Sequence, residues 1–315
     1  MSDPVKSIVV VGGGSAGWLT AGLLAAEHRQ RRKNDLSVTL IESPDVGPIG
    51  VGEGTWPTMR LSLEKIGVSE TDFLRHCDAS FKQGTLFNGW VSGGDDHYYH
   101  PFTPPAGFHE MTLGQYWWPH REQVSFAGAV SPQGYASDRF LAPKQIATPE
   151  FASVLNYGYH LDAGKFSGFL EQHCTAKLGV THIRDNVVAI NATETGDIAS
   201  LSLESGDTLA GDLFVDCTGF AALLIGKHFD VEFKSCEQYL FNDRALAVQV
   251  PRGNANEPIA STTRSTAQRA GWIWDIALPS RRGIGYVYSS RHASDAEAEA
   301  DLRQYLAKWA DAEFA

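Results

Sequence analysis

A glycine-rich turn between an apolar run and a helical pattern is the feature that most constrains the fold. Val5–Val11 is a short apolar run, typical of a strand buried on both faces, and Trp18–Glu27 has the residue spacing of a helix. Between them lies Gly12-Gly13-Gly14-Ser15-Ala16-Gly17, which matches G-x-G-x-x-G. A strand, a glycine turn and a helix in this order predict a parallel βαβ unit with a dinucleotide site.

The residues of this turn have separate expected roles. Gly12 permits the tight turn, Gly14 lets a pyrophosphate approach the backbone, and Gly17 lets the helix pack close to the strand. Ser15 and Ala16 stand at the start of the helix, where free N–H groups and the positive end of the helix dipole favour phosphates.

A carboxylate further along the chain fits the same ligand. Ser37–Ile41 is predicted to be a second strand and is followed by Glu42, which is placed to accept hydrogen bonds from a ribose diol. The spacing from Gly17 to Glu42 is 25 residues (42 − 17), and the polar insert Arg29–Asp35 accounts for its length. Two alternatives remain for the turn: a hydrolase nucleophile elbow centred on Ser15, and a structural turn without a ligand.

A second glycine-rich segment follows the second predicted strand. Its glycines would let the backbone approach a planar ligand closely, although a flexible connector is equally compatible with the pattern. The residues assigned to this loop are Gly50, Val51, Gly52, Glu53, Gly54 and Thr55.

Charge and composition exclude several classes of function. The 315 residues carry 26 Lys and Arg against 37 Asp and Glu, a net charge of −11, which disfavours nucleic-acid binding. The one short basic run, Arg29–Lys33, is interpreted as the solvated end of the first helix. With no membrane-length apolar stretch and no signal-peptide character, we expect a cytoplasmic protein without a membrane partner, either a monomer or a homodimer.

Neither the cysteines nor the His and Asp residues suggest a metal centre. The four cysteines are scattered without C-x-x-C spacing, and Cys217 is interpreted as a small buried residue. Asp95, Asp96, His97 and His100 fit no known metal-ligand spacing, so a polar loop is favoured there. No metal site is predicted.

The rest of the chain predicts mostly β structure and a final helix. Val187–Ile190, Ser200–Leu203 and Asp207–Ala210 read as an antiparallel meander, and Asp212–Cys217 as a buried strand. Gly271–Pro279 and Gly283–Ser290 predict a hairpin in which Trp272 and Trp274 face the same side. Ser294 and Glu297 form a capping box for the final helix. Aromatic residues are concentrated in residues 88–118 and 271–288, which suggests either a core or the wall of a pocket.

Taken together, these segments resemble the flavin-dependent halogenase family, the tryptophan halogenases and their relatives. The most specific match is the W-x-W-x-I segment Trp272–Ile276, downstream of Lys82. The other matching segments occur in the family's order: Gly12–Gly17, Gly50–Pro57, Ser80–Gly84, Tyr159–Ala163, Asp216–Phe220 and Gly285–Ser290.

The resemblance implies a mixed α/β fold like that of the FAD-dependent monooxygenases. It would combine a Rossmann-type FAD-binding module, formed by residues 1–80 and 155–235, with an aromatic-rich substrate-binding module, formed by residues 81–154 and 236–315. FADH2 from a separate flavin reductase, O2, and chloride or bromide would yield hypohalous acid. An indole or another electron-rich aromatic, tryptophan included, would then be halogenated.

The resemblance also implies roles for particular residues. Lys82 matches the lysine beside the substrate, which hydrogen-bonds the oxidant or becomes a haloamine, although its flanks alone favour a solvent-exposed lysine. Trp272, Trp274 and Ile276 match the segment that keeps the substrate away from the flavin. Ala277 follows Ile276 where the family has proline, and Gly54 and Trp56 are also unusual, so another indole or a phenol is as much expected as free tryptophan.

The sequence leads to one further expectation and two alternatives. The family's later flavin segment, its halide site and the glutamate that partners the lysine are not found before Ala315, so a fragment of a longer reading frame, or a degenerate member, is expected. The alternative functions are an FAD-dependent aromatic monooxygenase and a non-catalytic FAD-binding fragment.

Overall fold

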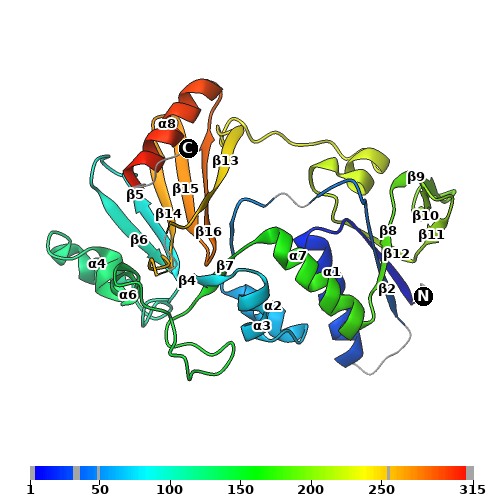
Figure 1. Cartoon of the computed structure of the whole chain (residues 1–315), viewed down its shortest axis with the longest axis horizontal. Helices are drawn as coiled ribbons and strands as arrows, with labels where there is room; N and C mark the ends of the chain where they lie inside the picture. Colours follow the sequence, from blue (N-terminus) through cyan, green and yellow to red (C-terminus); the bar gives the residue numbers. More distant parts are fainter. Residues whose placement is uncertain (1–3, 31–35, 48–49, 254–255, 310–315) are drawn as a thin grey trace. The chain divides into compact units, whose positions relative to one another are not determined.

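The computed structural model describes residues 4–30, 36–47, 50–253 and 256–309 (Figure 1). The chain divides into two compact units. The first comprises Met1–Ile49, Ser62–Cys77 and Ala163–Lys234, and the second Gly50–Leu61, Asp78–Asp162 and Ser235–Ala315. The functional roles predicted for two modules stay predictions. Most of the basic run predicted to end the first helix, residues 31–33, lies outside the described residues.

The first unit is built on a parallel sheet of four strands in the order β12-β1-β2-β8. These strands are β1 (Ser7–Val11), β2 (Ser37–Glu42), β8 (Thr181–Arg184) and β12 (Leu213–Asp216). The apolar run of β1 lies between β2 and β12, and its last four residues are buried. The parallel sheet confirms the predicted Rossmann-type βαβ unit.

Helices and a small antiparallel sheet complete the first unit. Helix α1 (Ser15–Gln30) follows the glycine turn and runs beside α7 (Ala163–His173) (Figure 1). The predicted meander is confirmed as β9 (Val187–Ala192), β10 (Ile198–Leu203) and β11 (Thr208–Ala210). Leu201 and Leu203 of β10 share an apolar core with Val9 and Val11 of β1. The remaining helical segments are α3 (Glu70–His76), η2 (Cys174–Leu178), η3 (Gly219–Ala221) and η4 (Leu223–His228).

A sheet of six strands dominates the second unit, in the order β13-β16-β15-β14-β5-β6. Its strands are β5 (Gly84–Asn88), β6 (His97–Pro101), β13 (Arg244–Pro251), β14 (Thr263–Gln268), β15 (Gly271–Ala277) and β16 (Arg281–Tyr288). The predicted hairpin is confirmed as β15 and β16, whereas β5 and β14 are paired in parallel. Helix α8 (Asp295–Trp309) packs on one face of the sheet, where Leu302 and Tyr305 join an apolar core with Ile273 and Tyr286.

A second, smaller sheet of this unit has the order β3-β7-β4. Its strands are β3 (Glu53–Gly54), β4 (Ser80–Lys82) and β7 (Gly158–Leu161). Short helices separate β6 from β7 in the sequence: α4 (Leu113–Trp117), η1 (Trp118–His120), α5 (Phe126–Val130) and α6 (Gln133–Asp138). Helix α2 (Thr58–Lys65) contains residues of both units.

Several local features and surface properties complete the description. The predicted capping box is confirmed, because the Ser294 N–H donates to Glu297 at 2.8 Å and the Glu297 N–H donates to the Ser294 hydroxyl at 3.3 Å. The bonds from Ser294 lower the pKa of Glu297 to about 2.

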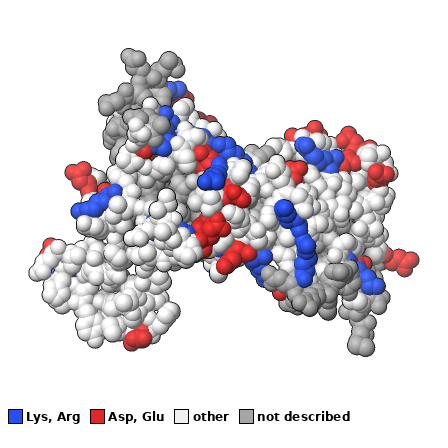
Figure 2. Space-filling model, turned by 60° about the horizontal axis from the view of Figure 1, so that its bottom comes forward, with Lys and Arg blue, Asp and Glu red and all other residues white. Residues whose placement is uncertain are grey.

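Within the described ranges, no helix has the length and apolar character needed to cross a bilayer. On the face shown in Figure 2, acidic and basic side chains are interspersed.

A buried carboxylate links the two strands of the hairpin to each other and to α8. Asp275 of β15 is 3% exposed and accepts hydrogen bonds from Arg282 of β16 and from the Tyr305 hydroxyl of α8, the latter at 2.9 Å. Because Arg282 is itself largely buried, this carboxylate balances a positive charge that water solvates poorly.

We predict that Asp275→Asn lowers the free energy of unfolding by about 3 kcal/mol, because it removes the carboxylate that pairs with a buried guanidinium. The matched control is Glu299→Gln, which removes one partner of an exposed pair between Glu299 and Arg303 on α8. The control should change stability by about 0.5 kcal/mol or less. Urea unfolding of both variants measures the difference, and equal losses would contradict the role given to Asp275.

Candidate functional site

The glycine turn of the first unit depends on two close backbone approaches. Gly12 has φ +116°, and a Cβ atom there would lie 2.3 Å from the Cys217 carbonyl oxygen at the end of β12. A Cβ atom on Gly17 would lie 1.8 Å from the Gly12 carbonyl oxygen. Both positions therefore exclude any side chain, in agreement with the tight turn and close helix packing expected from the sequence.

The third position of the turn, Gly14, is open instead of crowded. Among the described residues, no heavy atom outside the turn lies within 4 Å of the position that a Cβ atom on Gly14 would take. Helix α1 begins at the next residue, Ser15, so the first N–H groups of the helix have no partner within it. This open backbone surface at a helix N-terminus fits the pyrophosphate of a dinucleotide.

The hydroxyl of Ser15 does not contact a general base. Its oxygen lies 3.3 Å from the Ser167 hydroxyl oxygen of α7, and either group can donate. The nucleophile elbow needs a histidine at hydrogen-bond distance from the serine, and Ser15 has a second serine in that place.

Glu42 lies on the glycine turn, as a ribose-binding carboxylate should. It is the last residue of β2, and a Cβ atom on Gly13 would lie 1.5 Å from its Oε2 atom. Its Oε1 atom is 2.9 Å from Nε2 of His182 on β8. His182 and the neighbouring Glu171 were not predicted as site residues, because a contact between β2, β8 and α7 leaves no mark on local sequence patterns.

The second glycine loop belongs to the second unit and packs on the hairpin. Gly52 has φ +96°, and a Cβ atom there would lie 3.2 Å from the Gly283 Cα and 3.5 Å from a methyl carbon of Ile276. A Cβ atom on Gly283 would in turn lie 1.8 Å from the Val51 carbonyl oxygen. The structure therefore brings the loop and Ile276 together.

The two polar side chains of this loop have structural partners. Glu53 accepts a hydrogen bond from the Val51 N–H at 3.1 Å, and the Thr55 hydroxyl accepts one from the Tyr159 N–H at 2.9 Å. The backbone of Gly50, Gly52 and Gly54 thus remains the part of the loop best suited to a flat ligand, and this ligand role stays a prediction.

Lys82 shares one face of the small sheet with Gly54 and His160. In the antiparallel register, Lys82 is opposite Gly158, while His160, two residues further along β7, is opposite both Ser80 and Gly54. Residues opposite one another, or two apart along a strand, share a face. A Cβ atom on Gly54 would lie 2.9 Å from the Lys82 Nζ, so Gly54 leaves the space that the ammonium group occupies.

The surroundings of Lys82 are unusual for a lysine. The side chain is half-buried, and Nζ lies 5.5 Å from the ring centre of Phe102 and 6.0 Å from that of Trp56. Burial lowers the pKa of Lys82 to about 8. The exposed lysine that its flanks favour is therefore wrong, and the desolvated lysine implied by the family resemblance agrees with the structure.

His160 is the buried neighbour of Lys82 on this face of the small sheet. Its side chain is fully buried, and its Nε2 atom is 2.9 Å from the Thr263 hydroxyl oxygen of β14. Burial, with a smaller contribution from the charge of Lys82, lowers the pKa of His160 to about 3. His160 is therefore neutral at pH 7 and adds no positive charge beside Lys82.

The tryptophan pair lies on the same face of the large sheet as Thr263. Trp274 is opposite Ser265, two residues from Thr263, and Trp272 is opposite Ala267. The Trp274 indole covers Gly285, where a Cβ atom would lie 2.1 Å from a ring carbon. The Trp272 ring is 6.2 Å from Trp90, so the two aromatic-rich segments of the sequence meet at this point.

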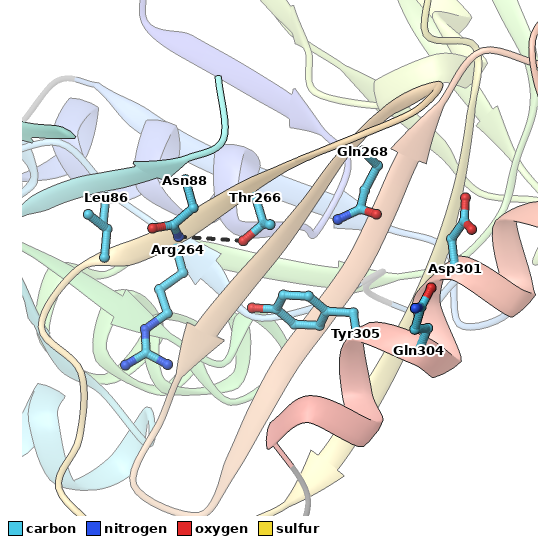
Figure 3. Close-up of a pocket in the computed structure, with 8 residues that line it drawn as sticks. All are labelled: Leu86, Asn88, Arg264, Thr266, Gln268, Asp301, Gln304 and Tyr305. Carbon is cyan, nitrogen blue, oxygen red and sulfur yellow. Dashed lines mark hydrogen bonds between the residues drawn. The ribbon is translucent and has the colours of Figure 1, made fainter. Parts of the chain in front are cut away.

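A polar cavity lies on the opposite face of β14. Figure 3 shows the side chains of β5, β14 and α8 that line it. The cavity has a volume of about 290 Å³. Its lining residues are Leu86, Asn88, Arg264, Thr266, Gln268, Asp301, Gln304 and Tyr305. None of these eight residues was predicted as a site residue, and the aromatic wall formed by the tryptophan pair does not face this cavity.

All four cysteines lie within the described residues, and none of them forms a disulfide. Cys217 is half-buried, whereas the sequence predicts a buried residue. Burial raises the pKa of the Cys217 thiol, which disfavours the reactive thiolate.

Known proteins resemble this chain along nearly its whole length. The family model described as tryptophan halogenase matches residues 7–314. The tryptophan 7-halogenase RebH of Lentzea aerocolonigenes is 33% identical, over 98% of this chain and 60% of its own length. The chain therefore spans about 60% of the length of such curated relatives.

Solved structures show the same relationship. The crystal structure of a tryptophan halogenase from Shewanella frigidimarina NCIMB 400 has a TM-score of 0.94 and 54% identity, and covers 99% of this chain and 60% of that one. The tryptophan 6-halogenase SttH of Streptomyces toxytricini has a TM-score of 0.87 and 34% identity. This match covers 96% of the present chain and 60% of the SttH chain. The fold is that of the flavin-dependent halogenases, and the chain belongs to the tryptophan halogenase family.

Proposed function

We propose that this chain belongs to an FAD-dependent enzyme that halogenates an electron-rich aromatic compound, and that Lys82 is its catalytic residue. The observation that carries the proposal is the half-buried Lys82 amine, which lies beside the rings of Phe102 and Trp56 and against Gly54 and has a pKa near 8. Relatives that match nearly the whole chain are named tryptophan 7-halogenase and tryptophan 6-halogenase, which supports an indole as the substrate class.

The residues of the first unit would bind the dinucleotide. The open backbone at Gly14 and the start of α1 would receive the pyrophosphate, and Glu42 would accept hydrogen bonds from the ribose. The loop residues Gly50–Thr55 would offer backbone to the flavin ring. When bound and reduced by a separate reductase, FAD would supply hypohalous acid from O2 and chloride or bromide.

Lys82 would hold the oxidant beside the substrate. With a pKa of about 8, the side chain is mostly an ammonium group at pH 7, so it can donate a hydrogen bond to the oxygen of hypohalous acid. The aromatic carbon then takes the halogen and loses its proton, and the oxygen leaves in water. The aromatic rings around Lys82 would exclude water and contact the flat face of the substrate.

The direct test is a mass-spectrometric assay of tryptophan, other indoles and phenols with flavin reductase, NADH, O2 and either halide. We predict halogenated product from the wild-type chain and a loss of at least about 100-fold for Lys82→Met, because the donor to the oxidant is removed. The exposed Lys227→Met variant is the matched control and should keep its activity.

Three results of this assay would count against the proposal. A hydroxylated product formed equally well without halide would indicate an aromatic monooxygenase. The absence of any product, together with retained FAD binding, would indicate a non-catalytic FAD-binding chain. Full activity of Lys82→Met would remove Lys82 from the mechanism.

The pH dependence of lysine acylation tests the electrostatics of Lys82 without turnover. Only the neutral amine reacts, so we expect Lys82 to reach half its maximal acylation rate near pH 8. A lysine in an unfolded chain has a pKa of about 10.4 and should need more alkaline conditions. Peptide mapping after brief treatment with acetic anhydride measures both, in folded and urea-unfolded protein. Identical profiles would contradict the desolvated site.

Because the backbone at Gly14 is open, a substitution there should weaken FAD binding without lowering the stability of the fold. Gly14→Val should leave the thermal midpoint almost unchanged, because no neighbour lies within 4 Å, and should weaken FAD binding at least tenfold because it blocks the pyrophosphate. Gly114→Val on α4 is the matched control, since that position is equally open. Calorimetry and fluorescence titration measure the two effects, and unaltered FAD affinity in Gly14→Val would place the dinucleotide elsewhere.

A further inference from the structure

We propose that His182 is a positioning residue, held by Glu171 and Trp18, that fixes the Glu42 carboxylate for the ribose of the bound dinucleotide. This inference rests on the proposed FAD binding and extends it to residues outside the glycine turn.

The four side chains, those of His182, Glu42, Glu171 and Trp18, come from four different elements of the first unit. His182 is on β8, where it is paired with Leu40, and its Nε2 atom lies 2.9 Å from Oε1 of Glu42 on β2. Its Nδ1 atom lies 3.3 Å from Oε1 of Glu171 on α7. The edge of its ring meets Trp18 of α1, with the ring centres 4.9 Å apart, so the imidazole is held on three sides.

The protonation state of an imidazole determines to how many of two neighbouring carboxylates it can donate a hydrogen bond. A neutral imidazole has one N–H group and can donate to only one of them, whereas imidazolium donates to both. A further charged group in reach is Arg184 of β8, whose Nε atom lies 3.9 Å from Glu42 Oε1. The His182 and Glu42 side chains are only 13% and 20% exposed, so the hydrogen bond between them is partly shielded from water, whereas the Glu171 side chain is 40% exposed.

Through His182, the orientation of Glu42 is set before a ligand binds. One oxygen, Oε1, is held by His182, while the other, Oε2, stays beside Gly13 of the glycine turn. A glutamate that is already ordered loses less conformational freedom when it accepts the ribose hydroxyls, so binding is tighter. Glu171 acts one step further away, by orienting the imidazole.

A metal ion is the other ligand chemistry that these side chains suggest. One ligand atom from each of Glu42, Glu171 and His182 can be chosen so that all lie within 4.8 Å of one another. The two carboxylates, however, contact different nitrogens of the ring, and one ion coordinates only one of these nitrogens. The arrangement therefore favours direct contacts of the imidazole with the two carboxylates over a metal centre.

The test measures affinities for FAD, ADP and FMN by calorimetry or fluorescence, without turnover. His182→Phe keeps an aromatic ring against Trp18 but removes the hydrogen bond to Glu42 and the contact with Glu171. We expect FAD and ADP, which contain the adenosine ribose, to bind about tenfold more weakly, and FMN, which lacks it, to bind as before. Glu171→Gln should give a smaller loss, and the exposed His76→Phe variant of α3 is the matched control.

A double-mutant cycle distinguishes positioning from a general structural effect. In a Glu42→Gln background, His182→Phe should cause little further loss of ADP affinity, since the group that it positions is already impaired. A full additional tenfold loss in that background, or wild-type affinity of His182→Phe for both FAD and ADP, would overturn the proposal.

Two further outcomes identify a different failure. Stoichiometric binding of Zn²⁺ or Mn²⁺ that His182→Phe abolishes would replace the proposal with a metal centre. A wild-type chain that binds neither FAD nor ADP would overturn the proposed flavin binding itself, and this inference with it.

Discussion

In both candidate sites, side chains and backbone groups pack directly against glycine residues, at positions that leave no room for a Cβ atom. In the first unit, the carbonyl oxygen of Gly12 lies where a side chain on Gly17 would begin, and Glu42 lies directly on Gly13. In the second unit, the Lys82 ammonium lies against Gly54, and the Trp274 indole lies on Gly285. Each contact places a functional group against bare backbone, where any Cβ atom would force it away.

The chemistry proposed for Lys82 follows from this packing. A lysine exposed to water keeps its charge over the whole neutral range, whereas burial between Phe102, Trp56 and the small sheet brings its pKa close to neutrality. His160 contributes by remaining neutral, because a second cation beside Lys82 would compete for the same anions and hydrogen-bond acceptors. The Thr263 hydroxyl connects this small sheet to the face of the large sheet that carries the tryptophan pair.

The secondary-structure elements and caps that depend on residues close together in the chain were predicted from the sequence. The strand before the glycine turn, the helix after it, the meander, the hairpin and the Ser294–Glu297 capping box all have local patterns, and the structure confirms them. The element bounds differ modestly, since β9 continues to Ala192 where the pattern predicts an end at Ile190. Capping, turn chemistry and apolar periodicity act within a few residues, so they can be recognised in one sequence.

Contacts between distant segments could not be predicted in this way. Strand β5 pairs with β14 far along the chain, and Lys82 owes its burial to Gly54 and Phe102 on other segments. The flanks of Lys82 alone favour an exposed side chain, and only the resemblance to a family suggested otherwise. His182 carried no signal at all, because its importance comes from the parallel pairing of β8 with β2 and from the proximity of α7.

The most direct measurement of the central claim is a crystal structure of the protein with an aromatic substrate bound. The account predicts the substrate ring against Phe102 and Trp56, with the carbon to be halogenated next to the Lys82 amine. A substrate bound instead in the polar cavity beside Tyr305, on the opposite face of β14, would contradict it.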